Sequence, residues 1–196
     1  MKIGYDLDWT LTTWKTPPWN FASQLIDRRD WIGEPPSEYG LHVFSPQTRE
    51  VLIQLFNSDF YMNQCPVPRF YSQNLLTQQH VAGNRQFIIT ARAAHIRPGT
   101  ISLVNRFFPE VEDVLFVDPG HSKASTIDGL GLDVWVDDDP NELARAGAAG
   151  LPTIIAEAPW NETNWPHARR ASDCLQIAMY LDKLKEDLLY YGKIQS

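Results

Sequence analysis

Short runs of consecutive apolar residues alternate along most of this chain with segments whose apolar residues recur at helical spacing. Five runs have the length and the β-branched or aromatic content of buried strands. They span residues 2–7, 86–90, 114–117, 133–136 and 153–156. The most regular helical segments span 69–82, 98–107 and 171–190. Alternation of this kind is typical of a mostly parallel sheet with helices on both faces, so the pattern predicts an α/β fold built on five parallel strands.

Residues 14–66 interrupt this alternation with many aromatic residues and prolines. One helix is clear within them, because Ser45 is suited to an N-cap and Pro46 to the first helical position. The segment is too long for a connection inside a compact domain. We therefore predict a small, mainly helical cap at 14–66, inserted into a core formed by 1–13 and 67–196.

Composition narrows the class of protein. A chain of 196 residues fits one domain with an insertion, and its net charge of −7 argues against a surface that coats nucleic acid. Cys65 and Cys174 lie far apart, with neither metal-binding spacing nor a disulfide framework. No signal peptide precedes the first strand, and no apolar run is long enough to cross a bilayer. We expect a cytoplasmic protein with no membrane association and no stable nucleic-acid binding.

Two carboxylates, Asp6 and Asp8, follow the first predicted strand. At a strand end both can converge on the crevice beyond the carboxyl edge of the sheet, where open α/β folds bind ligands. Adjacent negative charges repel each other unless a cation or a shared proton lies between them. Taken alone, the pair fits either a ligand site or a polar strand end in which one Asp caps a helix.

Four segments in chain order resemble the motifs of the haloacid dehalogenase superfamily of phosphotransferases. The first motif, Asp-x-Asp-x-Thr, is followed by a Thr that ends a hydrophobic strand, an isolated Lys, and an acidic pair after another strand. The matching residues are Asp6, Asp8, Thr10, Thr90, Lys123, Asp137 and Asp138. The resemblance implies a Rossmann-like core of three layers and the activity of a phosphomonoesterase.

The resemblance also implies a role for each matching residue. Asp6 is the expected nucleophile, which forms an aspartyl-phosphate, and Asp8 is the general acid and later the base. Thr90 is expected to donate a hydrogen bond to the phosphate, and Lys123 to offset its charge. Lys123 is the sole lysine between the second and fourth motifs; the alternative is an ordinary surface lysine.

The expected cofactor is Mg²⁺, which prefers oxygen ligands in octahedral geometry. Its expected ligands are Asp6, the backbone carbonyl of Asp8 and Asp137, with Asp138 in support. For Arg92, substrate contact and a structural ion pair are both open. The residues expected to contact substrate are Trp9, Trp14, Trp19, Thr90, Ala91, Arg92 and Lys123.

Within the superfamily, the chain most resembles the 5'(3')-deoxyribonucleotidase-like branch. The similar features are a cap directly after the first motif, the segment 66–68, and the segments 159–162 and 169–172. This branch implies a (deoxy)nucleoside monophosphate as substrate. Trp9 departs from the Gly of many small-molecule phosphatases, which puts the leaving-group pocket in doubt.

Two alternatives stay open. One is a catalytically weak binding protein, and the other is a phosphatase for another small phosphate ester or for nucleic-acid 3' phosphates. The aromatic residues of the cap fit either base stacking or the cap's own core. The oligomeric state is open as well, and a homodimer is one alternative.

Overall fold

The computed structural model of the chain describes residues 1–14, 17–25, 44–161 and 168–192. Residues 26–43 of the predicted cap and residues 162–167 lie outside the described residues. No helix within the described ranges combines the length and the apolar content that crossing a bilayer requires.

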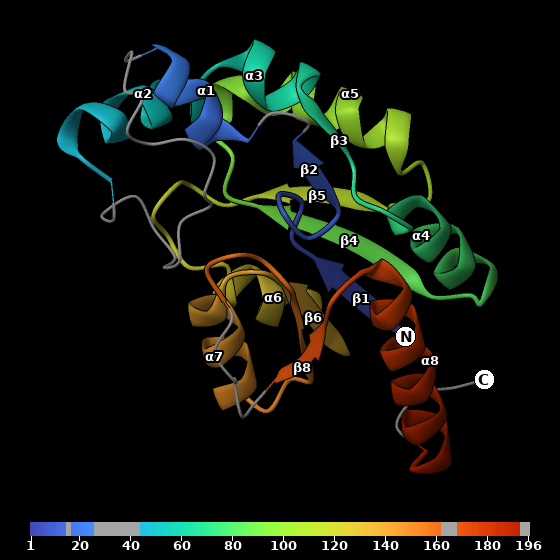
Figure 1. The fold of residues 1–196 in the computed structure, drawn as a ribbon. Coiled ribbons are helices and arrows are strands. Elements are labelled where there is room, and N and C mark those ends of the chain that lie inside the picture. Colours follow the sequence, from blue (N-terminus) through green and yellow to red (C-terminus); the bar gives the residue numbers. More distant parts are fainter. Residues whose placement is uncertain (15–16, 26–43, 162–167, 193–196) are drawn as a thin grey trace.

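Six parallel strands form the central sheet in the order β5-β4-β1-β6-β7-β8 (Figure 1). Their bounds are β1 Lys2–Tyr5, β4 Arg85–Thr90, β5 Asp113–Phe116, β6 Val134–Asp137, β7 Thr153–Ala156 and β8 Ala168–Ala171. β1 lies between β4 and β6, so the carboxyl ends of these three strands are neighbours. The parallel sheet and its five predicted strands are confirmed.

The prediction of only five strands is wrong, because β8 adds a sixth at the edge of the sheet. β8 pairs with β7 from Thr153 opposite Ala168 to Ala156 opposite Ala171. Its sequence, Ala-Arg-Arg-Ala, contains no apolar run. An edge strand needs less apolar surface than a central strand, and charged residues on it oppose pairing with other chains. The predicted closing helix also begins later than expected, at Cys174.

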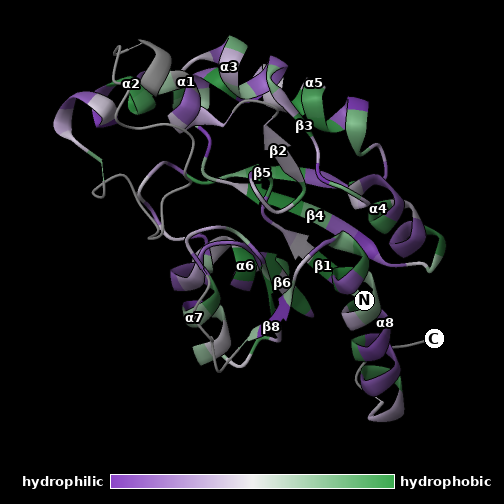
Figure 2. Ribbon diagram, viewed as in Figure 1, coloured by the Kyte–Doolittle hydropathy of each residue, from purple (hydrophilic) through white to green (hydrophobic). Residues whose placement is uncertain are grey.

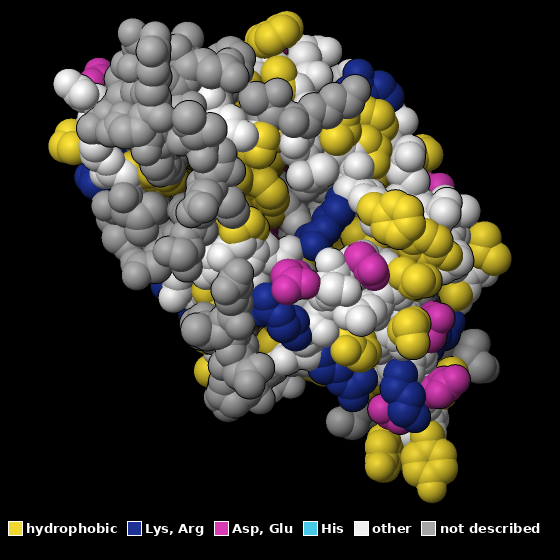
Figure 3. Space-filling view, viewed as in Figure 1, with side chains coloured by type: hydrophobic (Ala, Val, Ile, Leu, Met, Phe, Trp, Pro, Cys, Tyr) yellow, Lys and Arg dark blue, Asp and Glu magenta, His cyan; other side chains and the backbone are white. Residues whose placement is uncertain are grey.

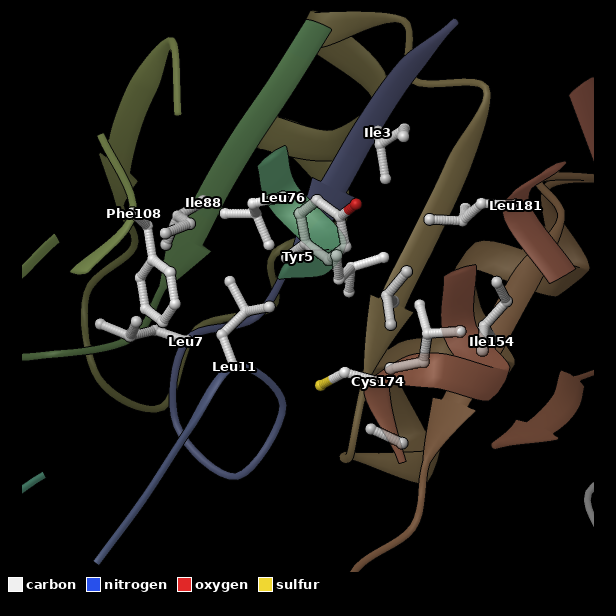
Figure 4. Packing of buried hydrophobic residues seen from close by; sticks show 14 of the residues in the cluster. Ile3, Tyr5, Leu7, Leu11, Leu76, Ile88, Phe108, Ile154, Cys174 and Leu181 are labelled. Carbon is white, nitrogen blue, oxygen red and sulfur yellow. The ribbon is translucent and has the colours of Figure 1, made fainter. Parts of the chain in front are cut away.

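Helices cover both faces of the sheet, which gives the predicted three layers. The helices after the cap are α4 Ser72–Val81, α5 Arg97–Phe107, α6 Ala124–Leu130, α7 Pro140–Ala148 and α8 Cys174–Tyr190. Helices α4, α5 and α8 pack on the face that presents Tyr5 and Ile88 (Figure 4). Helices α6 and α7 pack on the opposite face, against Phe87 and Trp135. Hydrophobic and hydrophilic bands alternate along α8, as expected for a helix that covers a sheet (Figure 2).

A second, two-stranded sheet lies where the predicted cap begins and ends. β2 Thr12–Trp14 pairs antiparallel with β3 Pro66–Pro68, and Trp14 lies opposite Pro66. Between them come α1 Pro18–Leu25, α2 Pro46–Phe56 and α3 Asp59–Gln64. These helices lie together beyond one end of the main sheet, near α5 (Figure 1). The division into core and cap stays a prediction.

One predicted helix start is confirmed, and a second helix begins with the same kind of cap. The Ser45 side chain accepts a hydrogen bond from the amide of Thr48 and caps α2, with Pro46 as its first residue. The Asp139 side chain caps α7 by accepting from the amide of Asn141 at 2.8 Å. The Asp139 side chain thereby serves its own helix as the N-cap.

Charged side chains of both signs are interspersed with hydrophobic ones over the face shown in Figure 3. This surface differs from the continuous basic stripe that is typical of proteins that coat nucleic acid.

Candidate active site

The chain turns sharply directly after β1. The amide of Asp6 donates to the carbonyl of Val136 at 2.8 Å, so β1 stays beside β6 up to this residue. The carbonyl of Leu7 then accepts from the amide of Thr12 at 2.9 Å and from its hydroxyl at 3.1 Å. These bonds close a tight loop that holds both Asp6 and Asp8 at the carboxyl end of the sheet.

Lys123 bridges the first and fourth motifs. Its Nζ lies 2.6 Å from Oδ1 of Asp6 and 2.9 Å from Oδ2 of Asp137. Lys123 is only 7% exposed, and both carboxylates are buried. Lys123 is therefore not a surface lysine, because burying its charge requires these two partners.

Lys123 is itself positioned by Glu142, a buried residue of α7. Oε2 of Glu142 accepts from the amide of Lys123 and from the hydroxyl of Ser122, each at 3.0 Å. Glu142 also forms an ion pair with Arg145. The sequence carries no motif that identifies Glu142, which is separated from Lys123 by a helix and a strand.

Two tryptophans hold the acidic pair at the end of β6, Asp137 and Asp138. Oδ2 of Asp137 accepts from the indole of Trp135 at 3.1 Å. Oδ2 of Asp138 accepts from the indole of Trp160 at 3.0 Å, and Thr10 of the first motif reaches Oδ1 of Asp138 at 3.4 Å. Trp160 lies in a segment that was noted only for its resemblance to the nucleotidase-like branch.

Burial dominates the electrostatics of this cluster. It raises the pKa of Asp6 to about 7, a shift that Lys123 opposes and that Asp137 and Asp8 increase. Burial also raises the pKa of Asp137, and it raises the pKa of Asp138 well above its usual range with the help of neighbouring negative charges. Burial alone would lower the pKa of Lys123, but Asp137 and Asp6 outweigh it and raise that pKa.

The carboxylates fit a divalent cation. Asp6, Asp137 and Asp138 each place one oxygen within 4.8 Å of the others, and all three are buried. The four carboxylates of the first and fourth motifs face two cationic side chains, Lys123 and Arg92, which leaves two negative charges in excess. Hard oxygen donors with this excess suit Mg²⁺. The side chain of Asp8 is not part of the cluster, and its predicted backbone contribution stays a prediction.

Arg92 forms an ion pair with Asp8. Its Nε donates to Oδ2 of Asp8 at 2.9 Å and its Nη2 to Oδ1 at 2.6 Å, a bidentate arrangement. Its Nη1 donates to Asn63 at 2.9 Å and to Thr100 at 3.2 Å. Arg92 is 4% exposed and all three of its nitrogens have partners, so the structure contains the ion pair that the sequence left open. Thr90, two residues earlier, ends β4 and is buried.

Four tryptophans form a cluster beside these carboxylates. Trp9 stacks on Trp19 with ring centroids 5.2 Å apart, packs edge-on against Trp160 at 5.0 Å, and contacts Trp14 at 5.4 Å. Trp9 has a φ of 62°, in the left-handed region that Gly adopts without strain. The cluster thus explains the departure from Gly, because the Trp9 ring joins the first-motif loop to α1 and to Trp160.

Arg69 also fixes the loop that contains Trp9. Its guanidinium donates to the carbonyl of Trp9 at 2.6 Å, of Glu157 at 2.8 Å and of Ser172 at 3.1 Å. These carbonyls belong to the first-motif loop and to the segments that follow β7 and β8. The sequence gives no signal for this role, because the three acceptors are backbone groups of distant segments.

One cavity of about 680 Å³ brings the predicted residues together. It is lined by every residue expected to act in catalysis, metal binding or substrate contact, namely Asp6, Asp8, Trp9, Trp14, Trp19, Thr90, Ala91, Arg92, Lys123, Asp137 and Asp138. Apolar residues of α2, namely Leu52, Ile53 and Phe56, also line it. This lining suits a ligand with a charged group, which the carboxylates and their cation would hold, and an apolar group, which would contact α2.

Comparison with known proteins identifies the fold. No protein-family model and no curated protein matches the sequence. Similar solved structures include a haloacid dehalogenase-like hydrolase from Bacteroides fragilis, with 16% identity and a TM-score of 0.63 over 90% of this chain and 98% of that one. A protein assigned as a phosphoglycolate phosphatase from Lactobacillus delbrueckii has 12% identity and a TM-score of 0.61 over 92% and 97%.

A third similar structure is the archaeal beta-phosphoglucomutase from Pyrococcus, with 14% identity and a TM-score of 0.60 over 95% of this chain and 99% of that one. Likeness at such low identity establishes a shared fold. The chain therefore has the fold of the haloacid dehalogenase-like hydrolases, which its four motifs predict.

Proposed function

We propose that this protein is a Mg²⁺-dependent phosphomonoesterase that works through an aspartyl-phosphate on Asp6. The observation that carries this function is the convergence of Asp6, Lys123 and the acidic pair 137–138 in the lining of one cavity. A binding role alone does not need Asp8, a second carboxylate beside the nucleophile.

The residues divide the chemistry between them. A carboxylate oxygen of Asp6 attacks phosphorus and the bond to the leaving oxygen breaks, while Asp8 gives that oxygen a proton. Asp8 then takes a proton from the water that attacks the aspartyl-phosphate, which releases phosphate and restores Asp6. Lys123 holds Oδ1 of Asp6 in place, and Thr90 is suited to donate to the phosphate. Mg²⁺ held by Asp6 and the acidic pair would offset the charge of the phosphate.

For the substrate we propose a nucleoside monophosphate. Apolar residues of α2 line the same cavity as the carboxylates, and they suit a flat, neutral base. Among the described lining residues, the three cationic side chains already pair with carboxylates: Lys123 with Asp6 and Asp137, Arg92 with Asp8, and Arg145 with Glu142. This pairing disfavours a leaving group that carries its own anionic charge, such as the carboxylate of phosphoglycolate.

Hydrolysis of a panel of phosphate esters with Mg²⁺ tests this function. We expect kcat/KM for a deoxynucleoside 5'-monophosphate to exceed that for phosphoglycolate and for p-nitrophenyl phosphate. Preference for phosphoglycolate would refute the nucleotide assignment, and preference for a 3'-phosphorylated oligonucleotide would select the alternative substrate. Nucleotide binding without any turnover would identify a binding protein instead.

Replacing Asp8 by asparagine should slow hydrolysis most for esters with poor leaving groups. A nucleoside leaves as an alkoxide and needs the proton, whereas p-nitrophenolate leaves without it. We expect kcat for the nucleotide to fall by about 10²–10⁴-fold, the usual contribution of general acid catalysis. Release from p-nitrophenyl phosphate should fall much less in the first turnover, measured by rapid mixing. Equal losses in that turnover would exclude the acid role.

Trp19 and Ile53 both line the cavity, but we expect loss of Trp19 to lower stability and loss of Ile53 to weaken substrate binding. Trp19 is buried and stacked, so Trp19→Ala should lower the free energy of unfolding by about 3–5 kcal/mol. Ile53 is 44% exposed, so Ile53→Ala should leave stability nearly unchanged and raise KM for the nucleotide by about tenfold. Ile101→Ala is the matched control, because Ile101 is 43% exposed and does not line the cavity. An unchanged KM in Ile53→Ala would remove α2 from the substrate site.

A further inference from the structure

We propose, on the basis of the phosphatase function proposed above, that Asn63 is a positioning residue for the proton transfer. Asn63 does not line the cavity, and the structure gives it no contact with Asp8. It acts through Arg92, which binds both carboxylate oxygens of Asp8. Asn63 belongs to α3, in the segment predicted as the cap, so this contact couples the placement of α3 to the orientation of the acid.

The partners of Asn63 fix the orientation of its amide. Oδ1 accepts from Nη1 of Arg92 at 2.9 Å and from the hydroxyl of Thr100 at 3.1 Å. Nδ2 donates to Asp59 at 2.8 Å and to the carbonyl of Ile96 at 3.4 Å. Asn63 is 2% exposed, so water cannot replace these partners without a change in packing. Exchange of the amide nitrogen and oxygen would set donor against donor at Arg92, so a single orientation is stable.

Arg92 transmits this orientation because its guanidinium is rigid and planar. Nε and Nη2 bind Asp8, while Nη1 is held by Asn63 and Thr100. The plane of the Asp8 carboxylate is therefore set by the anchor at Nη1. A small error in the position of a catalytic group is enough to cost a large part of its effect.

A glycine of α5 makes room for this anchor. A Cβ atom at Gly99 would lie 2.4 Å from Nδ2 of Asn63 and 2.7 Å from Oδ1 of Asp59. Real Cβ atoms do not approach so closely, so Gly99→Ala must displace the Asn63 side chain or the helix that carries it. Gly99 does not line the cavity, so we expect an effect of this substitution on proton transfer to pass through the anchor at Nη1 of Arg92, which Asn63 and Thr100 form.

Asn63→Ala and Gly99→Ala test the inference. Their losses of activity should show the same dependence on the leaving group as that of Asp8→Asn. In both variants we expect kcat for the nucleotide to fall by about 10–100-fold, while KM and the first-turnover rate with p-nitrophenyl phosphate stay within about threefold. Gly129→Ala is the matched control, because Gly129 is also helical and a Cβ there meets nothing within 4 Å; its kcat should be unchanged. Equal losses on both esters, or no loss on either, would overturn the inference.

A stability measurement separates this inference from the proposed function. If the unaltered protein hydrolyses no ester, the phosphatase assignment fails, but a double-mutant cycle between Asn63→Ala and Asp8→Asn is still informative. We expect their effects on the unfolding equilibrium constant to be non-additive by about threefold or more, because both act on Arg92. Additive effects would show that Asn63 does not act on Asp8 through Arg92, and would overturn the inference even in an active enzyme.

Discussion

Replacing Asp6 with asparagine is expected to lower kcat by about 10⁴-fold or more, because an amide oxygen is not a competent nucleophile toward phosphorus. The substitution also removes a negative charge that Lys123 contacts at 2.6 Å. The fold should survive, since the amide has nearly the shape of the carboxylate. Burial raises the pKa of Asp6 to about 7, so its charge is held at a cost that the neutral amide does not carry. Activity with a nucleotide and Mg²⁺, together with a thermal melt, measures both effects.

Asp128→Asn is the matched control for this substitution. Asp128 is an exposed residue of α6, so the same chemical change there should alter neither kcat nor the melting temperature. Substantial phosphatase activity in Asp6→Asn would refute the aspartyl-phosphate. Loss of the folded state in Asp6→Asn would instead mean that the Asp6–Lys123 ion pair is required for folding.

The sequence was sufficient for the parts of this molecule that are encoded locally. β1, β4, β5, β6 and β7 are each a run of apolar residues, and the caps of α2 and α7 follow from a Ser or Asp directly before a proline. β8 was not predicted, because it is not encoded in a local run of apolar residues. It carries Arg169 and Arg170 in its centre and gains its place from pairing with β7, which a pattern of apolar residues does not record.

The candidate site likewise contains residues that the local sequence predicts and residues that it does not. The catalytic and metal-binding candidates were predicted because they occur in a fixed order, most of them at strand ends, and the structure places them around one cavity. Residues that support them, such as Glu142, Trp160 and Arg69, were not found. Their contacts join segments that are far apart in the chain, and several go to backbone groups. Only the fold brings such pairs together, so no spacing in the sequence predicts them.

The aromatic residues show a further limit of sequence reasoning. A tryptophan in a cap is equally suited to stack on a base or on another tryptophan. In the structure Trp9 stacks on Trp19 and is tilted against Trp14, and both Trp9 and Trp19 pack edge-on against Trp160. We therefore direct the test of base binding to α2 and not to Trp14 or Trp19, which are buried among these aromatic contacts.

Removal of the divalent cation is expected to lower the phosphatase rate by about 10³-fold, since a metal ion supplies several kcal/mol of charge stabilisation in such reactions. Without it, a phosphate would approach Asp6, Asp8, Asp137 and Asp138 against their combined charge. Added Mg²⁺ should restore the rate after chelation. Ca²⁺ should not, because its larger and more variable coordination allows Asp6 to bind through both oxygens and lose its position for attack. Full activity in chelator would refute the metal site.

The stability of the metal-free protein should carry a matching pH dependence, which does not require turnover. The pKa of Asp6 is about 7 in the folded state against an ordinary value of 3.8, so the folded state binds more protons than the unfolded state between these values. The stability that protonated Asp6 contributes is therefore present at low pH and is lost as the pH rises toward 7.

Mg²⁺ replaces the missing proton as the partner of the carboxylates, so its effect on the melting temperature should be larger at pH 8 than at pH 5.5. Asp137→Asn removes one of the three clustered carboxylates, and it should reduce both the loss of stability with pH and the gain from Mg²⁺. A Mg²⁺ effect equal at both pH values, or unchanged in Asp137→Asn, would place the ion elsewhere.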